Sequence, residues 1–63
     1  MKEVYINTNE VESCWEKDNI CFVKMKSGKV WLCELYAIDK IMANKNKIVA
    51  VKLTTKGSDS YGK

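Results

Sequence analysis

The stretch CFVKMKSGKVWLC, from Cys21 to Cys33, decides the fold expected of this chain. Large apolar residues lie on both sides of Ser27-Gly28, a pattern typical of two antiparallel strands joined by a tight turn. Serine resists the left-handed conformation that a two-residue hairpin loop requires, whereas Gly28 adopts it freely. We therefore favour a three-residue loop ending at Gly28, and this register predicts that Cys21 lies directly opposite Cys33. A two-residue loop would instead place Cys21 opposite Glu34.

Three further segments, before and after this hairpin, have the alternating or β-branched composition of strands. Between the hairpin and the last of them, Leu35, Ile38, Ile41 and Met42 recur at the spacing of one helical face. The sequence therefore predicts an α+β fold, a small antiparallel meander with one short helix. The strands are expected at residues 2–7, 10–16, 20–26, 29–35 and 48–54, and the helix at 36–45. The alternative is a five-stranded small barrel with a helical turn before the last strand.

A chain of 63 residues forms one domain, which we expect at residues 1–55, followed by a flexible polar tail at 56–63. A domain this short buries only about 60% of the surface that its unfolded chain exposes. Its folding free energy is consequently a small difference between large terms. Small domains without disulfides or metals often gain stability by association, so we expect a homodimer.

The N-terminal segment lacks the apolar run of a signal peptide, and no stretch approaches the length of a membrane-spanning helix. The chain has three cysteines, an odd number, and no export signal. These features predict a reducing cytoplasmic location without membrane association. The chain is also rich in Lys, Asn and Ile, whose codons are AT-rich, and this composition favours a low-GC bacterium or one of its phages.

The net charge of +3 comes from 11 basic and 8 acidic residues, and every basic residue is a lysine. Lysine neutralises phosphate as a point charge, but bidentate base recognition and base stacking depend mainly on arginine. Nucleic-acid binding is therefore the alternative function rather than the first one. The lysines that would carry it are Lys24, Lys26, Lys29, Lys47 and Lys52.

The cysteines and acidic residues do not form a recognisable chemical site. Zinc commonly takes four ligands, whereas Cys14, Cys21 and Cys33 are three, and the chain has no histidine. A thiol nucleophile needs a neighbouring base. The acids between residues 10 and 18 lack calcium-loop spacing and are typical of a solvated strand edge. We interpret the cysteines as packing residues, with a Cys21–Cys33 disulfide or a metal site as the alternatives, and predict no catalytic residue, cofactor or metal.

Both faces of the central hairpin are apolar, whereas one amphipathic helix can cover only one face. The second face must close into a barrel, meet a second copy or dock on a partner. The candidate interface residues are Trp15, Phe22, Met25, Trp31 and Tyr36. We predict a non-enzymatic binding module that acts by protein contact, as a phage or mobile-element inhibitor or regulator of a host protein complex such as a defence or transcription machine.

Overall fold

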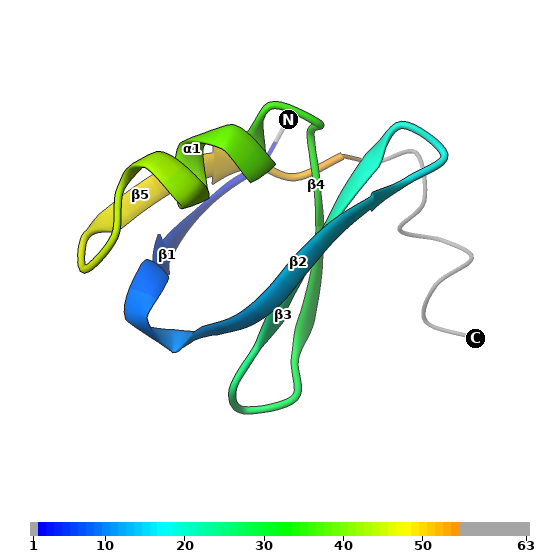
Figure 1. Cartoon of the computed structure of the whole chain (residues 1–63). Helices are drawn as coiled ribbons and strands as arrows, with labels where there is room; N and C mark the ends of the chain where they lie inside the picture. Colours follow the sequence, from blue (N-terminus) through cyan, green and yellow to red (C-terminus); the bar gives the residue numbers. More distant parts are fainter. Residues whose placement is uncertain (1, 55–63) are drawn as a thin grey trace.

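The computed structural model describes residues 2–54, which form five strands, one α-helix and one 3-10 turn. The strands are β1 (Glu3–Asn7), β2 (Val11–Lys17), β3 (Ile20–Met25), β4 (Val30–Cys33) and β5 (Ile48–Lys52); the helix is α1 (Ala37–Ala43), and the 3-10 turn is η1 (Thr8–Glu10). Figure 1 shows the helix beside β1 and β5, with β2, β3 and β4 forming the other part of the fold. The predicted α+β class is confirmed. The predicted tail at 56–63 lies outside the described residues.

The strands β2, β3 and β4 form an antiparallel sheet in that order, which we call the large sheet. Cys21 pairs directly with Cys33, as the three-residue loop predicts. The Met25 amide donates to the Lys29 carbonyl at 2.8 Å and closes this loop. Gly28 has a φ of 100°, a conformation that L side chains rarely adopt. The hairpin register could therefore be predicted from this one glycine.

In the predicted meander the first strand would pair with the second, but in the structure it does not. Strand β1 pairs antiparallel with β5, in a separate two-stranded sheet that we call the small sheet. The chain turns away after β1 because η1 intervenes, and the Asn7 side chain accepts a hydrogen bond from the Asn9 amide at 3.0 Å. Pairing with β5 lets Ile6 pack inward beside Val49. A strand that continued straight into β2 would leave Val49 without this cover.

The two sheets join at one end only, and residues 2–54 do not close into the alternative barrel. Cys33 forms an isolated antiparallel bridge with Leu53. The Glu34 amide donates to the Lys52 carbonyl at 2.9 Å, and the Thr54 amide donates to the Leu32 carbonyl at 3.0 Å. Only the end of β4 therefore meets the chain that leaves β5.

The core contains residues from both sheets and from α1. Its buried members are Ile6, Cys21, Val23, Cys33, Ala37, Ile41, Val49 and Val51. In the helix, Ala37 and Ile41 are four residues apart and so lie on the same face, which points into the core. Met42, also predicted on the apolar face, is instead 65% exposed. No helix within residues 2–54 has the length and apolar character needed to cross a membrane.

Candidate binding surface

The outer face of the small sheet is the most exposed apolar surface of the described chain. Successive side chains of a strand point to opposite faces, so burying Ile6 in the core turns Tyr5 outward. The same alternation in β5 buries Val49 and turns Ile48 outward. Tyr5 is 72% exposed and Ile48 is 66% exposed. Because Tyr5 pairs with Ala50, two residues from Ile48, the three side chains form one surface, which we call the Tyr5–Ile48 face.

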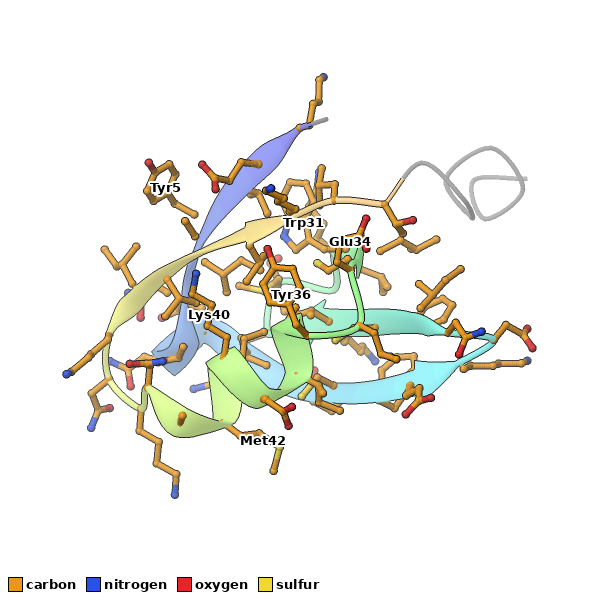
Figure 2. All side chains as sticks on the ribbon, turned by 90° about the horizontal axis from the view of Figure 1, so that it is seen from above. Tyr5, Trp31, Glu34, Tyr36, Lys40 and Met42 are labelled. Atoms are coloured by element: carbon orange, nitrogen blue, oxygen red, sulfur yellow. The ribbon has the colours of Figure 1, made fainter. Side chains whose placement is uncertain are left out.

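Polar residues border the Tyr5–Ile48 face. Glu3 pairs with Lys52 at one end of the ladder, and Asn7 pairs with Ile48 at the other. Figure 2 shows Tyr5 projecting away from the rest of the molecule, on the opposite side from Met42. An apolar centre with a polar border is the usual composition of a protein-binding surface.

The predicted interface residues Trp15 and Phe22 lie together on the outer face of the large sheet. The two residues are cross-strand partners, and their rings stack with centroids 5.5 Å apart and an interplanar angle of 3°. Trp15 is 39% exposed, whereas Ile20 and Leu32, also on this face, are buried. The outer face of the large sheet is therefore the better covered of the two outer faces.

The other three predicted interface residues lie elsewhere. Met25 and Trp31 point to the inner face of the large sheet and pack against the core. The Lys29 ammonium lies 4.4 Å from the centre of the Trp31 ring, a cation–π contact. Tyr36 precedes α1 and is partly exposed. The five residues consequently do not form one surface.

Two side chains of the helical segment cover the outer edge of β5. The Tyr36 hydroxyl accepts a hydrogen bond from the Lys52 amide at 3.1 Å. The Lys40 ammonium donates to the Ala50 carbonyl at 2.6 Å. Both side chains lie toward β5 in Figure 2. Tyr36 therefore has a structural contact that would not be recognised from its aromatic character alone.

The five lysines predicted for nucleic acid fall into two groups. Lys24 lies near the end of β3, and Lys26 and Lys29 lie in or beside its hairpin loop. Lys47 precedes β5, and Lys52 ends it. The β3–β4 turn and the start of β5 are well separated in Figure 1. In the first group Lys29 contacts the Trp31 ring and Lys24 shares a sheet face with Trp15, and in the second group Lys52 shares a sheet face with Tyr5.

The three cysteines share the inner face of the large sheet as free thiols. Burial, with a smaller contribution from Cys14 and then Glu16, raises the pKa of Cys21 to about 11. Burial and then Cys21 raise the pKa of Cys33 to about 12. A protonated, buried thiol is a poor nucleophile. Within residues 2–54, no three His, Cys, Asp or Glu side chains are placed so that they could hold a metal ion together.

The fold and surface define a small α+β domain of two antiparallel sheets with an exposed apolar sheet face. No protein-family model, curated protein or solved structure gives a significant match to this chain.

Sequence reasoning missed Tyr5 and Ile48 as interface residues. Each occupies an outward position of its own strand, where a single exposed apolar side chain is ordinary. They form a surface only because β1 pairs with β5, strands that are about forty residues apart in the chain. The available signal was the alternation in both segments, which puts Tyr5 on the other face of its strand from Ile6, and Ile48 on the other face of its strand from Val49.

Proposed function

We propose that this protein is a non-enzymatic binding module that acts through protein contact at the Tyr5–Ile48 face. The supporting observation is the exposure of Tyr5 and Ile48 as neighbours on one sheet face. Tyrosine offers a large, rigid contact surface at low entropic cost and is enriched at binding hot spots. The buried thiols, with pKa values about 11 and 12, also favour a structural rather than a chemical role for the cysteines.

The partner that we propose is a protein of the host in which this chain acts, or a complex of host proteins. A phage or mobile-element inhibitor needs a stable surface and no chemistry of its own. The small size and lysine-rich composition support this class of protein. The Tyr5–Ile48 face supplies the contact surface that such a role requires.

Affinity capture from host cells with two matched variants tests this function. Ile48→Asn changes the Tyr5–Ile48 face, whereas Met42→Asn changes a side chain of nearly equal exposure, 65% against 66%, on α1. We expect the wild type and Met42→Asn to retain the same partner and Ile48→Asn to lose it. Equal retention by both variants would contradict the proposed surface. Unfolding midpoints of the two variants control for loss of fold.

Single-stranded nucleic acid is the second candidate, because Tyr5 shares a sheet face with Lys52. An exposed aromatic ring beside lysine can stack a base while the ammonium meets phosphate. Glu3, paired with Lys52, opposes this use. Binding to DNA and RNA oligonucleotides across a salt titration would show a strong salt dependence if phosphate contacts carry the affinity. Absence of binding at low ionic strength would reject this candidate.

A further inference from the structure

The hydrogen-bonding pattern of the small sheet shows which groups of β1 are used. The Leu53 amide donates to the Lys2 carbonyl at 2.8 Å, and the Thr8 amide donates to the Lys47 carbonyl at 2.9 Å. Hydrogen-bonded and non-hydrogen-bonded pairs alternate along an antiparallel ladder. The even-numbered residues of β1 therefore direct their backbone groups to β5.

The odd-numbered residues of β1 direct their backbone groups to the opposite edge. These residues are Glu3, Tyr5 and Asn7. Within residues 2–54, Glu3 and Tyr5 have no backbone partner at that edge, whereas Asn7 is the N-cap of η1 and its carbonyl accepts the first hydrogen bond of that turn. The strand contains no proline, lysine or bulge, the usual features that prevent an edge from pairing. A two-stranded sheet with such an edge is prepared to accept another strand.

We propose that the occupant of this edge is a second copy of the chain, paired antiparallel through β1 about a two-fold axis. Tyr5 would pair with Tyr5 of the second copy, and Glu3 with Asn7 of the second copy. The Tyr5 pair uses backbone groups that point outward, and the Asn7 carbonyl would accept from Glu3 of the second copy through its second lone pair, in addition to its bond within η1. The two small sheets would then become one sheet of β5, β1, β1 and β5.

The charges along this edge are compatible with self-pairing. Glu3 meets an amide of the second copy, and no like charges lie directly opposite each other. Strand β2 provides the contrast at the free edge of the large sheet. Its outward backbone groups belong to even-numbered residues, and two-fold pairing centred on Cys14 would place Glu12 against Glu16 of the second copy. Like charges directly opposite are destabilising, and β2 also has a bulge between Val11 and Ser13.

The dimer goes beyond the proposed function, because it does not depend on any other partner. It would place two Tyr5–Ile48 faces side by side on one surface, with the two Tyr5 rings adjacent at its centre. One strand edge is a small interface, so we expect a dimer that dissociates on dilution. The homodimer predicted from chain length thereby acquires a specific interface.

Sedimentation equilibrium of the full chain tests the dimer, at protein concentrations up to about 1 mM so that a weak dissociation constant can be measured. Two variants at one position are compared. Asn7→Lys would place two lysines opposite Glu3 residues, and Asn7→Glu would place two glutamates there. Asn7→Lys removes the acceptor of the Asn9 amide, whereas Asn7→Glu keeps carboxylate oxygens, so the unfolding midpoints of both variants control for this contact. We expect Asn7→Lys to dimerise at least about 4-fold more tightly than Asn7→Glu, from two exposed charge pairs that change sign.

Tyr5→Pro gives a second measurement, because proline removes the outward amide and leaves the bonds to β5 in place. We expect this variant to be monomeric, and Tyr5→Ala, which keeps the amide, to retain dimerisation. A monomeric wild type at every concentration would overturn the proposal. A dimer with equal dissociation constants for the two Asn7 variants would also overturn it, because the interface would then lie elsewhere. Neither result would affect partner capture through Ile48.

Discussion

Replacing Lys40 by methionine tests whether the helix stabilises the small sheet through its edge. Methionine keeps an unbranched apolar side chain but removes the ammonium that donates to the Ala50 carbonyl at 2.6 Å. This hydrogen bond is short, involves a charged donor and is partly buried, so it belongs to the stronger class. The Ala50 carbonyl can recover a water molecule at this depth, so the loss is smaller than for a sealed core.

We expect Lys40→Met to lower the free energy of unfolding by about 1–2 kcal/mol. For a domain of this size, that loss corresponds to a fall in Tm of about 4–16 °C. Urea unfolding followed by tryptophan fluorescence measures it, with Lys45→Met as the control because Lys45 is exposed on the segment that follows α1. Equal unfolding midpoints for the two variants would refute the idea that Lys40 holds the β5 edge.

Three further changes have expected outcomes. Gly28→Ala should cost about 1–2 kcal/mol because Gly28 has a φ of 100°, and no atom lies within 4 Å of the added Cβ; a thermal melt unchanged from wild type would contradict this. The pKa of Cys21 and that of Cys33 are raised from 9.0 to about 11 and about 12. The unfolded chain therefore loses these protons first, and stability present below pH 9 should fall as pH rises through 11 and 12; urea midpoints in this range should decline less for Cys33→Ala. Thr8→Val removes the hydroxyl that donates to the Asn44 carbonyl at 2.8 Å, so hydrogen exchange should accelerate in η1, at a cost of about 1 kcal/mol.

The elements that could be predicted are those whose signals are local. Gly28 determines the hairpin loop, and the loop determines that Cys21 meets Cys33. The same register places Trp31 opposite Val23, on the face that carries the core cysteines. The inward position of Trp31 could therefore have been inferred from the sequence, but its aromatic character suggested an exposed interface instead.

The pairing of β1 with β5 could not be predicted from local signals. Residues 3–7 alternate equally well whether the strand pairs with β2 or with β5, because alternation reports the buried face and not the neighbour. The choice depends on η1, where the Asn7 side chain bonds the Asn9 amide and turns the chain. The Tyr5–Ile48 face follows from that long-range choice, so its residues were not among the predicted interface candidates.

The four sheet edges differ in how they are covered, and the difference bears on association. The β5 edge is covered by Tyr36 and Lys40, and the end of β4 bonds to Thr54. The β2 edge carries a bulge and acidic residues. Edge strands that lack such features pair with other chains, and within residues 2–54 the outer edge of β1 has neither a paired strand nor a bulge. Adding a bulge residue after Val4 should therefore abolish the dimer and leave a folded monomer, whereas a dimer that survives this insertion would show that another edge or face associates.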